Sequence, residues 1–189
     1  MTANEVPGGL GAAGRTADLD THRKHVFDLH TAPAKAYSGG RLRNADEKTF
    51  PILAGHDVSG VLVRLEPGGV REPHWHPSAW GLHYVIAGTG RFSILETEGY
   101  HEHFDATAGD VVFLPQGSLH YFENVSAEDY LAFLVFNTSA EEPRDDIGLA
   151  ASVNTIPHDA LGAVFGVPPE VFDHLPRKIE PVTIVRKPK

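Results

Sequence analysis

The sequence predicts an all-β domain, a sandwich or barrel of antiparallel strands. Short runs rich in branched and aromatic residues follow one another between residues 61 and 136, and Gly, Pro and Asp turns separate them. This spacing is typical of antiparallel sandwiches and barrels. The expected strands are Val61–Leu65, His83–Ile86, Arg91–Leu95, Val111–Leu114, His120–Val125 and Tyr130–Phe136.

The two ends of the chain differ from this middle part. Residues 1–23 are rich in Gly, Ala and polar side chains without an apolar period, so we expect a flexible tail before one domain over residues 24–189. Beyond the last expected strand, two short C-terminal helices are predicted at Pro157–Phe165 and Pro168–Leu175, because each opens at a proline. A final strand is expected at Ile179–Val185.

Composition narrows the classes of function. The 189 residues contain no cysteine, which excludes disulfides, cysteine–zinc sites and thiol nucleophiles. The formal charge of −9 argues against nucleic acid or an anionic membrane as a partner. No apolar run approaches the roughly 18 residues that span a bilayer, and no secretion signal is indicated, so we expect a cytoplasmic protein. The abundance of histidine, 12 residues, is the first indication of metal chemistry.

Two histidines separated by one residue form the first candidate metal site. On a strand, His74 and His76 face the same side while Trp75 faces the other, so both imidazoles can converge on one ion. A third candidate, His120, begins another expected strand. Such a pair alone is weak evidence, because surface histidines are common; the spacing of the surrounding glycines strengthens it.

Two spaced motifs frame these histidines. The first consists of Gly68, five residues, the run 74–76 and then Gly88. The second consists of Gly109, five residues, Pro115-Gln116-Gly117, two residues, His120, three residues and Asn124. Five further stretches accompany the two motifs and support the same family comparison: residues 39–43, 50–52, 65–77, 120–124 and 165–167.

Both motifs resemble those of the cupin superfamily, and the chain is similar to one cupin domain of the bicupin oxalate decarboxylases over roughly residues 36–176. The resemblance implies a single cupin barrel, which is a double-stranded β-helix or jelly roll. It also implies that His74, His76 and His120 are metal ligands.

One position departs from the family pattern. The family places a fourth ligand, a glutamate, where this sequence has Gly81. His83 lies two residues on and on the same strand face, so it can reach the ion if the strand bulges, or hydrogen-bond to substrate. A packed pocket histidine is the alternative interpretation of His83.

The loss of the carboxylate changes the expected metal chemistry. The site gains one unit of positive charge and an open coordination position, which is typical of catalytic rather than structural metal sites. Three neutral imidazoles suit Fe(II), Cu(II), Ni(II) or Zn(II) better than Mn(II), which prefers carboxylate oxygen and remains a candidate. Among these ions the resemblance favours Fe(II), because three-histidine cupin sites occur among Fe(II) dioxygenases.

Two further features bear on substrate chemistry. Arg71 matches the arginine that contacts the substrate carboxylate in oxalate decarboxylases, and we predict a bidentate contact there. Its strand parity is opposite to that of His74 unless Pro73 bends the chain. The acid of the family's mobile lid is shifted or absent, because a proline stands at its place; Glu141 and Glu142 precede that place and are interpreted as solvated loop charges.

The second His-x-His pair, His101 and His103, lacks a partner motif. We interpret it as a decoy near a hairpin tip.

The leading hypothesis is a metal-dependent enzyme that acts on a small carboxylate-bearing substrate by O2-linked oxidation or oxygenation, or by decarboxylation. In this reading Arg71 and His83 are the catalytic candidates, and oxalate itself is less favoured than in the parent family. The alternative is a non-catalytic metal- or ligand-binding module, since cupin folds host both. By analogy with cupin barrels, we expect a homodimer that pairs through residues 24–65.

Overall fold

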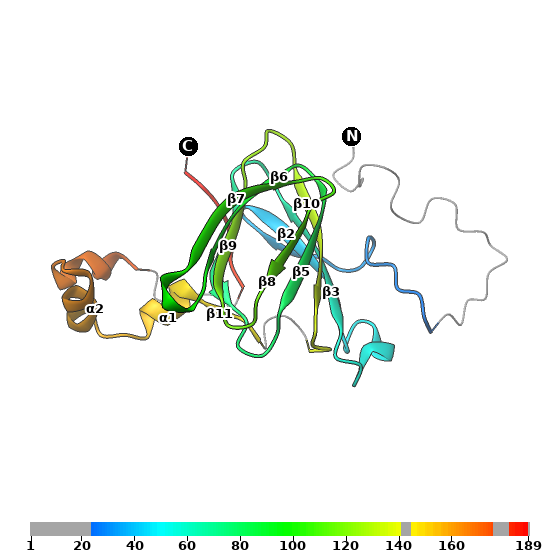
Figure 1. The fold of residues 1–189 in the computed structure, drawn as a ribbon, viewed down its shortest axis with the longest axis horizontal. Helices are drawn as coiled ribbons and strands as arrows, with labels where there is room; N and C mark the ends of the chain where they lie inside the picture. The colour runs from blue at the N-terminus through cyan, green and yellow to red at the C-terminus, as the bar shows by residue number, and fades with distance from the viewer. Residues whose placement is uncertain (1–23, 141–144, 176–181, 189) are drawn as a thin grey trace.

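The computed structural model describes residues 24–140, 145–175 and 182–188, and its body is a barrel of two antiparallel sheets (Figure 1). The first sheet has the strand order β1-β2-β3-β10-β5-β8. Its strands are β1 Lys35–Tyr37, β2 Gly40–Ala45, β3 Ser59–Leu65, β10 Tyr130–Phe136, β5 Gly81–Ala87 and β8 Val111–Leu114. The all-β jelly-roll prediction is therefore confirmed.

The second sheet has the order β11-β4-β9-β6-β7, and β12 also pairs with β4. Its strands are β11 Ile147–Gly148, β4 Gly69–Trp75, β9 Leu119–Asn124, β6 Thr89–Leu95, β7 His101–Thr107 and β12 Ile184–Arg186. All six strands expected from the sequence are present, four in the first sheet and two in the second. Because non-consecutive strands are neighbours, motifs that lie far apart in the sequence are brought side by side.

The core lies between the two sheets and is built from the inward-facing side chains of their strands. In β3, Val61, Val63 and Leu65 face inward and are buried, while the residues between them are half-buried. From the second sheet, Phe92 and Phe122 stack with their ring centroids 5.3 Å apart. This apolar layer fills one part of the barrel interior. The buried polar residues of β4 and β9, among them His74 and His120, lie in the other part.

Two of the motif glycines have backbone conformations that side chains disfavour. Gly88, between β5 and β6, has φ +77°, and a Cβ there would lie 2.6 Å from the carbonyl oxygen of Asp129. Gly117, which precedes β9, has φ +78° in open space. Glycine is needed at both turns because left-handed φ is costly for other residues.

The C-terminal part consists of short helices that project from one side of the barrel (Figure 1). Helix α1 spans Leu149–Asn154 and α2 spans His158–Phe165, and a 3₁₀ turn covers Pro169–His174. The first predicted helix is thus α2, and the second is a 3₁₀ segment rather than an α-helix. Two further 3₁₀ turns lie at Pro51–Leu53 and Thr97–Gly99.

Several predictions concern residues outside the described ranges. These are the flexible tail over 1–23, the loop acids Glu141 and Glu142, and the first residues of the final expected strand, of which β12 is the described part. Among the described residues, no helix has the length and apolar character needed to cross a membrane.

Candidate metal centre

The second sheet carries all three predicted ligands on neighbouring strands. His74 lies in β4 directly opposite His120 in β9, and His76 follows the end of β4. Trp75 alternates to the other face, as the strand period requires. All three histidines are buried.

Hydrogen bonds between the two sequence motifs hold this arrangement. The backbone amide of Gly117 donates to the carbonyl oxygen of His76 at 2.9 Å. The side-chain amide of Gln116 donates to the carbonyl oxygen of Pro77 at 2.8 Å. The turn of the second motif is therefore fastened to the histidine pair of the first.

Each of the three imidazoles is oriented by a backbone carbonyl. Nδ1 of His74 lies 2.7 Å from the Glu72 carbonyl oxygen, and Nδ1 of His76 lies 2.8 Å from the Asp145 carbonyl oxygen. Nδ1 of His120 lies 2.9 Å from the Ser118 carbonyl oxygen. Because a carbonyl only accepts, each Nδ1 carries the hydrogen, and Nε2 is the atom that a neutral ring offers to a metal.

The candidate ligand atoms of His74, His76 and His120 all lie within 4.8 Å of one another. Ring centroids are 4.3 Å apart for His74 and His120, 5.0 Å for His74 and His76, and 5.4 Å for His76 and His120. Nε2 of His120 is buried and has no hydrogen-bond partner. Three imidazoles held in this way, one with an unsatisfied buried acceptor, fit a divalent metal of the type that histidine binds.

Burial keeps these rings in the neutral form that coordination requires. Burial, with the neighbouring His76, lowers the pKa of His120 to about 3. The pKa of His74 lies well below its ordinary value, because burial and then the nearby charge of Arg71 disfavour its protonation. The lone pairs are consequently available for a metal well below neutral pH.

Arg71 points to the same side of β4 as His74, as expected if the chain bends at Pro73. The β4–β9 register shifts between Arg71 and His74, and both side chains are buried. The guanidinium does not stand open toward a substrate, however: Nη2 donates to the Asp146 carboxylate, and Nη1 lies 3.7 Å from Oε1 of Glu72. Burial raises the pKa of that Glu72 carboxyl group.

Position 81 and His83 face the site from the opposite sheet. A Cβ at Gly81 would lie 3.2 Å from Cε1 of Phe136 and 3.7 Å from Nε2 of His83, so these two rings border the space that a glutamate would enter. The Phe136 ring also contacts the ring of His76, with centroids 5.0 Å apart. His83 is buried and its Nδ1 has no hydrogen-bond partner.

The bulge that would carry His83 to the metal is not seen at this point of β5. Gly81 to Tyr84 pair with β8 in regular register, and the cluster of converging ligand atoms among the described residues comprises only the other three histidines. Burial, followed by the nearby His120 and His76, lowers the pKa of His83 well below its ordinary value. The His83 ring packs against the rings of Phe92 and Phe122, with centroids 5.9 and 5.2 Å away. A hydrogen bond to substrate and a packed pocket histidine both remain predictions for His83.

Two residues of the site were not identified from the sequence, Asp145 and Asp146. The first supplies the carbonyl that orients His76, and its carboxylate accepts from the Ser78 hydroxyl at 2.6 Å. The second pairs with Arg71. Their contacts span about 70 residues of chain, so no local pattern indicates them; only the adjacency of two acids is visible.

The second histidine pair lies elsewhere and takes no part in the cluster. His101 and His103 lie in β7, just past the hairpin tip rather than in it, and both are exposed. His103 Nδ1 is 2.7 Å from the Ser93 hydroxyl, and His101 Nδ1 is 3.2 Å from the Gly99 carbonyl oxygen. Within the described ranges, no third ligand joins them.

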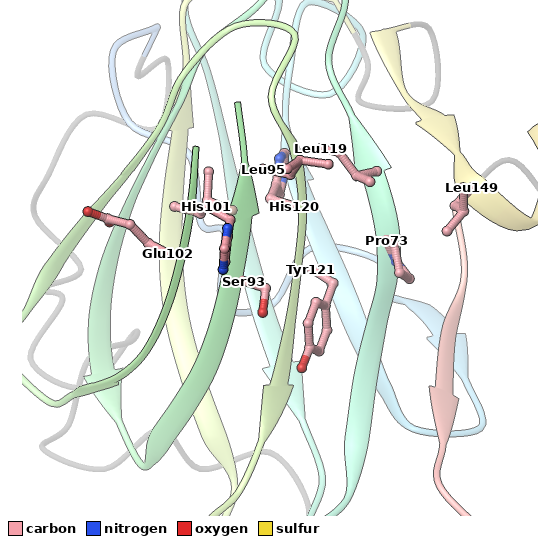
Figure 2. Close-up of a pocket in the computed structure, with 10 residues that line it drawn as sticks. Pro73, Ser93, Leu95, His101, Glu102, Leu119, His120, Tyr121 and Leu149 are labelled. Carbon is pink, nitrogen blue, oxygen red and sulfur yellow. The ribbon is translucent and has the colours of Figure 1, made fainter. Parts of the chain in front are cut away.

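A hollow of about 230 Å³ lies on the same sheet (Figure 2). Pro73, Tyr121 and Ser93 border it from the neighbouring strands β4, β9 and β6, and Leu149 of α1 lies at its edge. Its lining is mostly apolar, and His120 of the metal centre also borders it, so the hollow adjoins the site.

Comparisons with known proteins agree with this architecture. An oxalate decarboxylase of Arthroderma benhamiae is 33% identical over 164 residues, which are 86% of this chain and 38% of that protein. The oxalate decarboxylase OxdC of Bacillus subtilis is 28% identical over 95% of this chain and 46% of its own length. Legumin K of Pisum sativum is 34% identical over 62% of the chain. The chain thus spans less than half the length of these decarboxylases.

Solved structures of an oxalate decarboxylase are also similar to this fold. The structure of the B. subtilis oxalate decarboxylase at pH 4.6 superposes with a TM-score of 0.76 and 27% identity, over 85% of this chain and 41% of that one. A further structure of the same enzyme, described by its Mn(II) centres, also superposes with a TM-score of 0.76. The family model for cupins matches residues 29–172. With three quarters of its length covered by that match, this chain belongs to the cupin family.

Proposed function

We propose that this cupin is an enzyme that depends on a divalent metal and acts on a small carboxylate, by decarboxylation or by O2-linked oxidation. The observation that carries the proposal is the fixed orientation of His74, His76 and His120, whose Nδ1 atoms are all taken by backbone carbonyls. Such hydrogen bonds raise the basicity of ligating imidazoles and fix their direction. Histidines that merely fill the core would not need to direct three Nε2 atoms toward one point.

The metal, when bound, supplies a Lewis acid and, if redox-active, an electron acceptor. The other tasks fall to the chain's own residues. His83 Nε2 borders the same interior space and would hydrogen-bond to a bound substrate, and the ring of Phe136 packs beside His76. The Arg71 charge favours anionic ligands in the neighbourhood of His74.

The similarity to oxalate decarboxylases supports a carboxylate as substrate and decarboxylation as the reaction. Mn(II) centres in a similar structure support Mn(II) as a candidate beside Fe(II), the ion expected from three-histidine cupin sites. The alternative remains a non-catalytic metal- or ligand-binding cupin. Pairing of two chains through residues 24–65 and a cytoplasmic location remain predictions.

Elemental analysis of untagged protein tests the proposal first. We expect close to one equivalent of a divalent transition metal, lost in His76→Ala and kept in the control His101→Ala, which changes the exposed pair on β7. Metal-loaded protein is then supplied with oxalate and other small acids while CO2 release and O2 uptake are recorded. Absence of metal under loading conditions would overturn the metalloenzyme, and metal without turnover of any acid would favour the binding module.

A further inference from the structure

We propose that Asp146 determines the specificity of this site by occupying Arg71: its carboxylate holds the guanidinium while no substrate is bound, and a substrate carboxylate has to replace it. This inference rests on the proposed function, since it assigns the manner in which the same site takes a small carboxylate. It concerns a residue that the sequence motifs do not include. The ligand class is the free carboxylate of a small mono- or diacid.

The segment that carries Asp146 is fastened to the metal centre on both sides. The Asp145 carbonyl oxygen accepts from His76 Nδ1 at 2.8 Å, while Ile147 and Gly148 form β11 opposite Trp75 and His74. Asp146 therefore lies between an atom that orients one ligand and a strand that pairs with another. Its side chain is placed by this backbone rather than by a free surface loop.

The pair is deeply buried. The side chain of Arg71 is 1% exposed and that of Asp146 is 0% exposed. Ion pairs at this depth lose the screening of water, so each charge depends strongly on the partner that compensates it. A ligand that enters next to Arg71 consequently meets Asp146 as a direct competitor rather than as a distant charge.

The charges around Arg71 favour competition over joint binding. One guanidinium nitrogen, Nη2, contacts Asp146, and another, Nη1, lies 3.7 Å from the Glu72 carboxyl group. The chain itself thus provides two acidic groups for one cation. A third carboxylate would have to share a guanidinium whose Nη1 and Nη2 already face acids, and carboxylates so close together repel one another at low dielectric. A substrate carboxylate gains the guanidinium only as Asp146 releases it.

The consequence is a selective effect of Asp146 on anionic ligands. Asp146→Asn keeps the size of the side chain and removes its charge, so Arg71 becomes available to an incoming carboxylate. We expect malonate, a small diacid probe, to bind the metal-loaded variant about tenfold more tightly than the wild type, the scale of one close charge pair. Imidazole, a neutral ligand for the open metal position, should bind both proteins equally.

Calorimetric titration of the full-length, zinc-loaded protein with malonate and with imidazole provides the test. The matched control is Asp129→Asn, which removes the acid of another Arg–Asp pair, that with Arg64 on β3, outside the metal centre. Tighter malonate binding in Asp146→Asn, with both imidazole affinities and the control within about twofold of wild type, supports the proposal. Unchanged or weaker malonate binding overturns it, because Asp146 would then orient Arg71 rather than compete for it.

The same titration separates this inference from the proposed function. If the wild type takes up no zinc, both the proposed metalloenzyme and the proposed role of Asp146 are wrong. If zinc binds and Asp146→Asn binds malonate no more tightly than the wild type, only the proposed role of Asp146 is wrong.

A measurement on the unaltered protein covers the case in which Asp146→Asn does not fold. In the nitrogen-15 NMR spectrum, the Nε–Hε signal of Arg71, identified by its loss in Arg71→Lys, should shift when malonate is added to the zinc-loaded wild type. A signal that stays unchanged while malonate binds would overturn the proposal.

Discussion

Position 81 shows how a single missing side chain alters the interior of the barrel. The rings of Phe136 and His83 border the space in front of Gly81, at 3.2 and 3.7 Å from where a Cβ would lie. A methyl group can be accommodated there by a shift of a few tenths of an ångström. A carboxylate needs more room and, without a metal, would be buried without a counter-charge.

We therefore predict opposite responses to metal in two variants of Gly81. Gly81→Ala should cost about 1 kcal/mol of unfolding free energy, as mild overpacking does. Gly81→Glu should destabilise the metal-free protein more, because of the buried charge, and should gain more thermal stability from Mn(II) than the wild type does. Melting curves with and without Mn(II) provide the measurement. An equal Mn(II) effect in Gly81→Glu and wild type would contradict a ligand position at residue 81.

At this scale the sequence was informative about residue types and uninformative about their partners. The histidines that converge were predicted from a two-residue strand period and the spacing of two motifs. The carbonyls that fix their Nδ1 atoms, and the acid that pairs with Arg71, come from a segment about 70 residues away. Long-range side-chain pairing leaves no periodic pattern, which is why Asp146 was not anticipated.

At the scale of elements, an irregularity in the pairing of β4 with β9 positions the side chains of the site. The register shift between Arg71 and His74 brings both side chains to the interior, which a regular strand would prevent. The sequence indicated this only as a consequence of the proline between them. Six strands were predicted correctly, because alternation is a local property, but no bounds were predicted for β2, β4 and β7. The short helix predicted at Pro168–Leu175 forms as a 3₁₀ turn.

The turns that follow β5 and β8, with Gly88 and Gly117, provide a paired test. Gly117→Ala should cost about 1–2 kcal/mol of unfolding free energy, the strain of a left-handed φ alone. Gly88→Ala should cost more, because its Cβ would also approach the carbonyl oxygen of Asp129 to 2.6 Å. Urea unfolding of both variants at one pH gives the comparison. Equal losses would mean that the hairpin at Gly88 relaxes away from the contact.

At the scale of the whole molecule, buried neutral histidines link stability to pH. The pKa values of His74, His83 and His120 lie well below 6.5 in the folded chain, that of His120 at about 3, chiefly through burial. Below pH 6.5 the unfolded chain binds protons at these positions and the folded chain does not. Their contribution to stability is therefore complete above pH 6.5 and is lost as the pH falls toward the folded values.

We accordingly predict that the metal-free protein loses unfolding free energy between pH 7 and pH 5, about 2 kcal/mol of it through His120. Carboxylates titrate mainly below this interval, so the effect should be assignable to histidine. Urea unfolding at the two pH values checks the loss. His83→Leu should make the loss smaller, and an unaltered pH dependence in that variant would contradict a neutral, buried His83.

The position of the three histidines within one sheet has a mechanical consequence. His74 and His76 come from β4 and its end, and His120 comes from the adjacent β9, whereas residue 81 belongs to the other sheet. A metal bound to the three rings would cross-link β4 and β9, two neighbouring strands of one sheet. It would brace that sheet and make no link to the opposite sheet, to which residue 81 belongs.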